Sequence, residues 1–409
     1  MKVFVRTYGC RANQYDTEVV RSLLRASRIE EVETAEAADV AIFNSCTVTS
    51  AAEADLRSDV RRAHESNPGV RSIVMGCAAG APHRDESRAP LATLPGVDGI
   101  VAGGDVSQIA ALLGLPMILD GNRQTGARAL LRIQDGCDEH CTFCATTVSR
   151  GANRSRSSDE IVEEATRLSE THPEIVITGI HIGSYGADCA SSLGELVERL
   201  VREVAGVRFR LTSIEATEVD ERIRDLMTQD PRRVAPHLHA PLQSGSDRIL
   251  RRMGRHWYTS RSYRQSVERI ASKMPAFALS ADVITGFPGE TSEDHLETIR
   301  VVEDLPFTSL HVFPYSARPG TAATRLGGQV PSAIARQRAA ELRELAAKKS
   351  VAHERSRIGE KCDVVVVERG KGLTEDYLSV SIADESIPRR SRFDGNLFEQ
   401  NGKLTVSAA

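Results

Sequence analysis

Three cysteines lie within eight residues of the chain, in the run D-G-C-D-E-H-C-T-F-C that contains Cys137, Cys141 and Cys144. Thiolates packed this closely share one metal centre, so the loop that carries them has to fold around an ion or a cluster. Soft thiolate ligands suit iron–sulfur clusters, which normally take four cysteines. A compact set of three therefore predicts a cluster with one iron open to a substrate or cofactor.

A structural zinc site is the alternative for this run. His140 lies inside it, and three cysteines with one histidine are a common set of zinc ligands. However, His140 and Cys141 are neighbours in sequence, which strains joint tetrahedral binding, and the chain contains no C-x2-C pair besides the one in this run. The iron–sulfur interpretation is the stronger of the two.

The composition is that of an ordinary globular protein. Of the 409 residues, 41% are hydrophobic and 26% are charged, which fits two or three domains with a sizeable core. No stretch approaches the roughly 18 apolar residues of a membrane span, and the start, MKVFVRTYGCRANQ, has no signal-like apolar region. Eight cysteines suit metal binding in a reducing compartment better than a disulfide scaffold, so we expect a cytoplasmic protein without membrane contact.

The first segment, residues 1–117, alternates short apolar runs with helical patterns. Strands are predicted over 2–6, 39–43, 72–75 and 98–102, and helices over 15–26 and 49–65. This alternation predicts an α/β fold with an open parallel sheet of the Rossmann or flavodoxin kind.

Three further cysteines, Cys10, Cys46 and Cys77, each follow one of these predicted strands. Ligand sites in open parallel sheets lie beyond the carboxyl ends of the strands, so the three side chains can converge on one edge. A cysteine at a strand end is often only a small buried hydrophobe. Three at equivalent places favour a second three-cysteine cluster over that interpretation.

Residues 118–127, ILDGNRQTGA, contain turn formers and predict a linker into a second segment, 128–357. Its predicted strands are 174–178, 207–213, 236–242, 278–284 and 308–313, its predicted helices are 158–170, 193–204, 246–253 and 291–304, and a long charged helix over 331–357 follows. This repeat predicts a partial barrel of parallel strands with its chemistry at their carboxyl ends. The candidate cofactor-binding residues there are Gly179, Ser213, Gln243 and Gly286, with a plain turn or core role as the alternative for each.

The third segment, residues 358–409, contains three strand-like stretches at 362–368, 377–382 and 402–407. Its size fits a small OB-like β-barrel, which either holds RNA or only packs against the rest of the protein. The net charge of -4 argues weakly against nucleic acid, but arginines cluster locally and are candidate phosphate contacts. The clusters are Arg150/Arg154/Arg156, Arg248/Arg251/Arg252/Arg255 and Arg389/Arg390/Arg392, of which Arg251, Arg252, Arg255, Arg389 and Arg390 are the chosen RNA-binding candidates.

Taken in order, the motifs resemble those of the methylthiotransferases of the radical S-adenosylmethionine (SAM) superfamily along nearly the whole chain. They are T-Y-G-C-R-A-N-Q-Y-D-T-E, N-S-C-T-V-T, the C-x3-C-x2-C run, T-G-I-H-I-G-S-Y-G, H-L-H-A-P-L-Q-S-G-S-D, D-V-I-T-G-F-P-G-E and F-P-Y-S-A-R-P-G-T-A. The second and fourth motifs are most similar to the branch that modifies N6-threonylcarbamoyladenosine beside the tRNA anticodon. The sequence departs from many relatives in A-T-T-V-S-R-G after Cys144 and A-A-G after Cys77, which bears on the shape of the pockets over the clusters.

The resemblance implies two 4Fe–4S clusters with SAM as cofactor. Cys137, Cys141 and Cys144 would hold the SAM-binding cluster, and Cys10, Cys46 and Cys77 an auxiliary cluster that supplies sulfur. The implied product is the 2-methylthio derivative of the threonylcarbamoyl base. The implied partners are tRNA, held by a TRAM domain in the third segment, an external electron donor of the flavodoxin or ferredoxin kind, and a sulfur source.

Two kinds of alternative remain open at this point. Within the family, the same reaction on isopentenyladenosine in tRNA or on an aspartate of a ribosomal protein would use a similar barrel and similar clusters. Outside it, a non-enzymatic RNA-binding protein with structural zinc would use the same cysteines, although two cysteine triplets in one chain argue against it.

Overall fold

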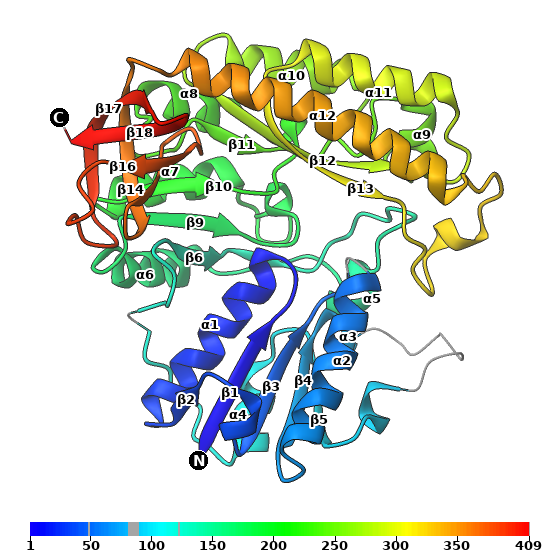
Figure 1. The fold of residues 1–409 in the computed structure, drawn as a ribbon, viewed down its shortest axis with the longest axis vertical. Coiled ribbons are helices and arrows are strands. Elements are labelled where there is room, and N and C mark those ends of the chain that lie inside the picture. The colour runs from blue at the N-terminus through cyan, green and yellow to red at the C-terminus, as the bar shows by residue number, and fades with distance from the viewer. Residues whose placement is uncertain (48–49, 81–89, 122, 409) are drawn as a thin grey trace. The chain divides into compact units, whose positions relative to one another are not determined.

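The computed structural model describes residues 1–47, 50–80, 90–121 and 123–408, which form two compact units (Figure 1). The first unit comprises Met1–Thr125, Gln134–Arg154 and Ser316–Thr324, and the second comprises Gly126–Ile133, Ser155–Tyr315 and Arg325–Ala409. Within the described ranges, no helix is both long and apolar enough to cross a membrane. The domain boundaries expected from the sequence stay a prediction. They divide the chain into residues 1–117, 118–127, 128–357 and 358–409.

The first unit is built on a parallel five-stranded sheet with the order β2-β1-β3-β4-β5. Its strands are β1 (Lys2–Thr7), β2 (Glu30–Val32), β3 (Val40–Ser45), β4 (Arg71–Gly76) and β5 (Val97–Ala102), and its helices are α1 (Arg11–Ala26), α2 (Ser50–Ser66), α3 (Cys77–Gly80), α4 (Val106–Leu113) and α5 (Thr146–Arg150). The predicted open parallel sheet is thereby confirmed. Thr49, the first residue of the helix predicted over 49–65, and Asn122 of the predicted linker lie outside the described residues.

Both faces of this sheet are covered because side chains alternate along each strand. Val40 and Ile42 of β3 pack in a core with residues of α1 and α4, whereas Ala41 and Phe43 pack in a second core with residues of α2. Figure 1 shows these helices flanking the strands. The sheet is therefore buried on both sides, which leaves its strand ends as the places where polar chemistry can sit.

The second unit contains six parallel strands in two three-stranded sheets, ordered β6-β9-β10 and β11-β12-β13. The strands are β6 (Ala129–Arg132), β9 (Glu174–Thr178), β10 (Arg208–Leu211), β11 (His237–His239), β12 (Ala278–Thr285) and β13 (Phe307–Pro314). The helices are α6 (Ser158–Ser169), α7 (Leu193–Glu203), α8 (Glu221–Gln229), α9 (Asp247–Arg252), α10 (Ser260–Ala271), α11 (Ser292–Asp304) and α12 (Ser332–Ser356). Two-residue strands, β7 (Gln134–Asp135) and β8 (Arg154–Ser155), flank the cysteine-rich loop.

A single apolar core joins both sheets of the second unit and one face of α12. On α6, for example, Ile161, Ala165 and Leu168 recur at helical spacing and are buried, while the acidic residues of the same helix face away. This repeated packing of helices on parallel strands is the predicted partial barrel.

The carboxyl-terminal part of the second unit is a closed five-stranded β-barrel with the order β14-β15-β16-β18-β17. Its strands are β14 (Lys361–Glu368), β15 (Lys371–Leu373), β16 (Ser379–Ile382), β17 (Arg392–Gln400) and β18 (Lys403–Ala408). The predicted small barrel is confirmed, although β15 and β17 are not among the predicted strands because they contain few apolar residues in alternation.

Candidate functional site

Cys10, Cys46 and Cys77 lie at the carboxyl edge of the first unit's sheet. Cys10 is the N-cap residue of α1, Cys46 directly follows β3, and Cys77 is the first residue of α3, directly after β4. Strands β1, β3 and β4 are parallel neighbours, so the three cysteines follow three adjacent strand ends. Cys10 is exposed, whereas Cys46 and Cys77 are buried.

Close packing of Cys46 against the turn before Cys10 requires a glycine. Gly9 has a φ of +89°, and a Cβ added to it would lie 2.4 Å from the Cys46 sulfur. Any other residue would combine an unfavourable backbone conformation with a direct clash. The glycine in T-Y-G-C therefore fixes how closely the first two cysteines approach each other.

Asn13 connects the three strand ends through its side chain. Its Nδ2 donates to the carbonyls of Tyr8, at 2.9 Å, and Ser45, at 2.6 Å, and its Oδ1 lies 3.7 Å from the Cys77 sulfur. The side chain is fully buried. One amide thus ties the segments that carry all three cysteines, at a position three residues after Cys10.

Arg150 places a buried cation against the third cysteine. Its Nε lies 3.2 Å from the Cys77 sulfur, and one of its terminal nitrogens donates to Asn13 Oδ1 and Asp16 Oδ2, both at 2.8 Å. Its other terminal nitrogen lies 3.1 Å from Asp135 Oδ1. Burial raises the pKa of Cys77 to about 11, although the Arg150 guanidinium lowers it, and thiolates at Cys10 and Cys46 raise it further. A metal that binds Cys77 would have to displace this proton.

The second triplet lies in the loop between β7 and α5. The Cys137 amide donates to the Gly151 carbonyl at 3.1 Å, and the Cys144 amide donates to the Cys141 carbonyl at 3.1 Å, which folds the loop back on itself. Backbone amides also point at sulfur, because Glu139 N lies 3.4 Å from the Cys137 sulfur and Thr146 N lies 3.3 Å from the Cys144 sulfur. All three cysteines are partly exposed.

The two cysteine triplets belong to the same unit. Arg150, which contacts Cys77, ends α5 six residues after Cys144, and Asp135, its partner, lies two residues before Cys137. Close packing supports this link, since a Cβ on Gly80 of α3 would lie 2.7 Å from the Ser149 carbonyl of α5. The loop that carries one triplet is thus fixed directly to the helix that begins with Cys77.

The donor atoms of both triplets suit iron–sulfur clusters, because each triplet offers three soft thiolate ligands. N–H···S contacts such as those at Cys137, Cys144 and Cys77 are typical of cluster sites, where they set the reduction potential.

Three of the four predicted cofactor-binding residues lie partly exposed at strand ends of the second unit. Gly179 directly follows β9, and Ser213 follows β10 with a φ of +57°. Gln243 has a φ of +60°, and its backbone bridges Asp282 and Ile284 of β12. Residues other than glycine seldom adopt a positive φ, and such positions cluster at ligand sites.

Gly286 has different surroundings, and its role as a cofactor contact stays a prediction. It is buried, and a Cβ there would lie 2.3 Å from the Ala335 Cβ of α12. Its amide donates to Glu290 Oε2 at 2.6 Å. The missing side chain makes room for α12.

The predicted RNA-binding arginines fall into three groups by exposure. Arg251 and Arg389 are exposed. Arg255 is buried against Trp257 and Tyr258 and ion-paired with Glu215, so its guanidinium is engaged inside the protein and its contact with RNA stays a prediction. Arg252 and Arg390 are partly buried. Arg252 donates to the carbonyls of Pro288 and Gly327, and Arg390 donates to the carbonyl of Gly126.

Three residues that surround the cysteines were missed by reasoning from the sequence. Asn13 and Asp16 lie on one face of α1, three and six residues after Cys10, which is a spacing that could have indicated them. Arg150 was grouped with Arg154 and Arg156 as a phosphate contact, and the structure corrects this because its side chain is buried between Asp16 and Cys77.

Two family models match the chain. The one described as "Uncharacterized protein family UPF0004" matches residues 2–96, and the one described as "Radical SAM superfamily" matches residues 131–302. Each match contains one cysteine triplet. The solved structure of a radical SAM methyltransferase, TsrM from Kitasatospora setae, is similar in fold, with a TM-score of 0.52 at 13% identity over 79% of this chain and 76% of that chain.

Characterised relatives extend the match over nearly the whole chain. Threonylcarbamoyladenosine tRNA methylthiotransferase MtaB of Bacillus subtilis is 33% identical over 410 residues, which cover 93% of this chain and 88% of that protein. The tRNA-2-methylthio-N(6)-dimethylallyladenosine synthase of Wolbachia pipientis is 32% identical over 400 residues, which cover 92% of this chain and 90% of that protein. Similarity of this extent, together with the two matched models, shows that this chain belongs to the radical SAM methylthiotransferase family.

Proposed function

We propose that this enzyme converts N6-threonylcarbamoyladenosine beside the anticodon of tRNA into its 2-methylthio derivative. The observation that carries the proposal is the pair of cysteine triplets in one compact unit, in a chain whose relatives include threonylcarbamoyladenosine tRNA methylthiotransferases. Replacing an aromatic C–H bond by C–S–CH3 requires both a hydrogen abstractor and a sulfur donor, and two separate metal sites meet that requirement.

The proposed cofactors are SAM and two 4Fe–4S clusters. Cys137, Cys141 and Cys144 would hold the cluster that binds SAM, and Cys10, Cys46 and Cys77 the auxiliary cluster. When bound, these groups supply hydrogen abstraction, a methyl group and a sulfur atom, while the protein supplies position and electrostatics. Each triplet leaves one iron of a 4Fe–4S cluster without a cysteine ligand, as such chemistry requires.

The side chains around the auxiliary triplet orient its ligands in this proposal. Asn13 fixes the strand ends that carry the cysteines, and Arg150 balances the negative charge that thiolates bring into a buried site. Asp16 and Asp135 in turn hold the guanidinium in place. The Cys77 sulfur therefore receives an N–H donor whose position is set from two sides.

The proposed SAM and tRNA contacts are groups that are at least partly exposed. Gly179, Ser213 and Gln243 are the proposed SAM-pocket residues, because they lie at the strand ends where barrels of this kind bind ligands. Arg251 and Arg389 are the proposed tRNA contacts, and the carboxyl-terminal barrel is the proposed TRAM-like RNA-binding module. An electron donor of the flavodoxin or ferredoxin kind and a sulfur source complete the proposed partners, in the cytoplasm.

A second substrate is favoured by one specific observation. A relative of nearly equal identity bears the name of a dimethylallyladenosine synthase, so the isopentenyl type of adenosine is the alternative base. A ribosomal-protein aspartate remains a weaker alternative.

The decisive experiment combines cluster analysis with tRNA analysis. Anaerobically reconstituted wild type should contain about eight irons per chain, and the triple variant Cys10→Ala, Cys46→Ala, Cys77→Ala about four. In tRNA from a deletion strain, the methylthio form of threonylcarbamoyladenosine should be missing and should return with wild type but not with the triple variant. Four irons in both proteins would remove the basis for sulfur insertion, and loss of the methylthio group from the dimethylallyl base would reassign the substrate.

A further inference from the structure

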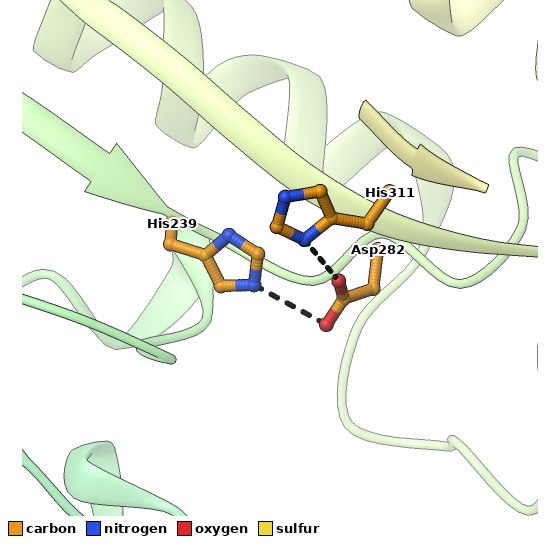
Figure 2. Close-up of side chains that lie close together, drawn as sticks. All are labelled: His239, Asp282 and His311. Carbon is orange, nitrogen blue, oxygen red and sulfur yellow. Dashed lines mark hydrogen bonds and ion pairs between the residues drawn. The ribbon is translucent and has the colours of Figure 1, made fainter. Parts of the chain in front are cut away.

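Three side chains with metal-binding groups converge on one face of the sheet β11-β12-β13. They are His239, Asp282 and His311, and one ligand atom from each lies within 4.8 Å of the others (Figure 2). All three belong to the second unit and are separate from both cysteine triplets in sequence. Within the described chain, this is the one group of three or more such residues that meets this spacing.

The register of the parallel strands dictates the convergence. Asp282 of β12 is the direct partner of His311 of β13, and His239 of β11 is the partner of Ser280. Ser280 and Asp282 are two residues apart, so their side chains point to the same face of the sheet. Because the three residues come from three adjacent strands, their positions are rigid before any ligand arrives.

The three groups are close enough to share one ion, with each imidazole facing a different oxygen of the carboxylate. His239 Nε2 lies 3.2 Å from Asp282 Oδ2, and His311 Nδ1 lies 3.2 Å from Asp282 Oδ1. Ligand atoms bound to one ion at about 2.0–2.2 Å are separated by about 3.0–3.5 Å from one another. Figure 2 shows one nitrogen of each imidazole ring directed at a different oxygen of the carboxylate.

The surroundings of His239 match those of a metal-binding histidine. Its other ring nitrogen, Nδ1, lies 3.0 Å from the Ser280 hydroxyl, and that hydroxyl lies 3.2 Å from His237 Nε2. Histidine ligands usually donate their second N–H to an oxygen in this way, which fixes the ring and its tautomer. The side of the site at His311 is open, since that side chain is 57% exposed.

We propose that His239, Asp282 and His311 form a mononuclear site for a divalent first-row transition metal ion such as Zn²⁺. Two imidazole nitrogens and one carboxylate oxygen are ligands of intermediate hardness, which suit zinc or iron(II) and not an iron–sulfur cluster. Three protein ligands leave at least one position open to water or to an oxygen of a bound molecule. The site does not depend on the assignment of the cysteines.

The test uses zinc as the probe on the anaerobically reconstituted full-length chain. Equilibrium dialysis at buffered free Zn²⁺ gives the zinc bound per chain, and iron and sulfide are measured on the same samples to show that the clusters are intact. The variants are Asp282→Asn, which keeps the shape but replaces one acceptor oxygen by an NH2 donor and removes the negative charge, and His311→Ala. His256→Ala, at an exposed histidine that does not belong to this group of three, is the matched control.

Wild type and His256→Ala should bind about one zinc per chain, and Asp282→Asn and His311→Ala none at the same free concentration. Ser280→Ala removes only the hydroxyl behind His239 and should weaken binding about 10–100-fold, so it reports on the site even if a ligand variant fails to fold. No bound zinc in wild type, equal binding in the ligand variants, or zinc that disappears only when cysteines are replaced would each overturn the proposal. The first two results would mean that Asp282 merely hydrogen-bonds two imidazoles.

Discussion

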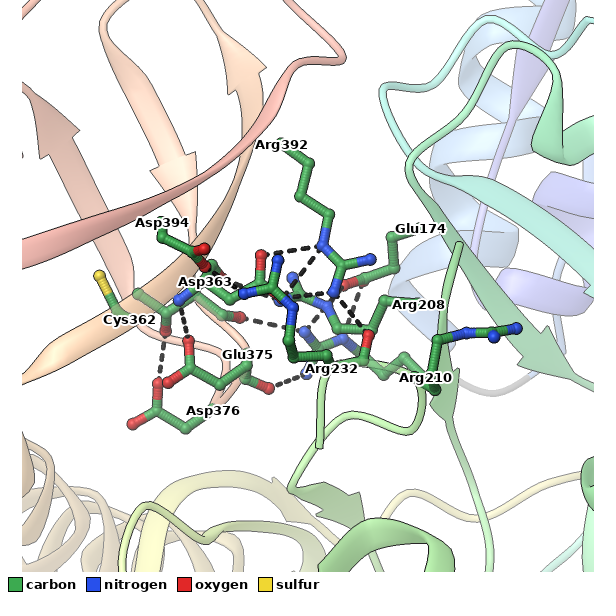
Figure 3. A network of polar contacts seen from close by, with 12 residues as sticks. Glu174, Arg208, Arg210, Arg232, Cys362, Asp363, Glu375, Asp376, Arg392 and Asp394 are labelled. Carbon is green, nitrogen blue, oxygen red and sulfur yellow. Dashed lines mark hydrogen bonds and ion pairs between the residues drawn. The ribbon is translucent and has the colours of Figure 1, made fainter. Parts of the chain in front are cut away.

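Glu174 is fully buried between two fully buried arginines, and its replacement by glutamine should destabilise the second unit strongly. Its Oε2 lies 2.6 Å from Arg208 Nε and its Oε1 2.8 Å from Arg210 Nε, while Arg128 lies 3.2 Å from Oε1. Figure 3 shows that the same arginines face the loops and strands of the carboxyl-terminal barrel. Arg208 donates to the Asp363 carbonyl, and Arg210 donates to the carbonyls of Thr374 and Glu375.

The magnitude follows from the loss of charge balance. Glu174→Gln keeps the size of the side chain but leaves the buried Arg210 without a carboxylate partner and Arg208 with Asp363 alone, a change that costs about 3–5 kcal/mol. For a unit of this size, each kcal/mol lowers the melting temperature by about 2–4 °C, so we expect a decrease of about 6–20 °C. Glutamate at an exposed position provides the control: Glu203 pairs with Arg199 on the surface, and Glu203→Gln should leave the melting temperature unchanged.

The assay is thermal unfolding followed by tryptophan fluorescence, because Trp257 is the single tryptophan of the chain and lies in the second unit. Burial alone would raise the pKa of Glu174, but Arg210 and Arg208 overcome this effect and hold it well below its usual value of 4.5. The ionised Glu174 side chain therefore stabilises the folded state at pH values above its usual pKa of 4.5, and this stabilisation is lost as the pH falls through the lower pKa of the folded state. Wild type should therefore lose more stability on acidification than Glu174→Gln, and equal melting temperatures at neutral pH would refute the reasoning.

Four further predictions concern the clusters and the RNA contacts. Cys141→Ala should abolish SAM cleavage, whereas Cys46→Ala should retain cleavage and form no methylthio product; equal cleavage in the first variant would refute the assignment. Gly9→Ala should reduce iron from about eight to about four per chain, because the new Cβ displaces the Cys46 sulfur, while Gly103→Ala, with a φ of +61° but open space around it, should retain both clusters. Arg150→Met should make the reduction potential of the auxiliary cluster more negative by on the order of 60 mV, equivalent to about 1.4 kcal/mol for one electron. A spectroscopic redox titration measures this shift in a chain whose Cys137, Cys141 and Cys144 are replaced. Arg154→Met is the control because the Arg154 side chain is 59% exposed, and equal shifts in both variants would argue against a specific contact. Arg389→Ala should weaken tRNA binding and reduce its salt dependence by about one counterion, and an unchanged slope would mean that this arginine touches no phosphate.

Much of the fold could be predicted because apolar periodicity marks its elements. The strand predicted over 174–178 matches β9, and α6, α7 and α11 lie within a residue or two of their predictions. Strand β2 was missed because its three residues, E-E-V, form an edge strand with little apolar content. The helix α4 was missed although Asp105 caps its start and Gly114 ends it, signals that were present in the sequence.

The cysteine positions could also be predicted, since parallel topology places strand ends side by side. The partners of buried charges could not. Arg208 and Arg210 occur in a strand-like stretch, but only the three-dimensional pairing with Glu174 explains how two arginines are buried there. The convergence of His239, Asp282 and His311 likewise depends on the register between strands, which the sequence does not specify by itself.

The first unit is formed by three separate segments of the chain, and this has a consequence for biosynthesis. Its last segment, Ser316–Thr324, is separated from Arg154 by roughly 160 residues that belong to the second unit. In this last segment, the Ala323 amide donates to the Thr142 carbonyl of the cysteine loop at 2.7 Å. At about 5–20 residues per second, all six cysteines leave the ribosome some 9–34 s before this segment can close the loop. During that interval the thiols of a nascent chain are more accessible to cluster-delivering proteins, and to oxidants, than those of the finished enzyme.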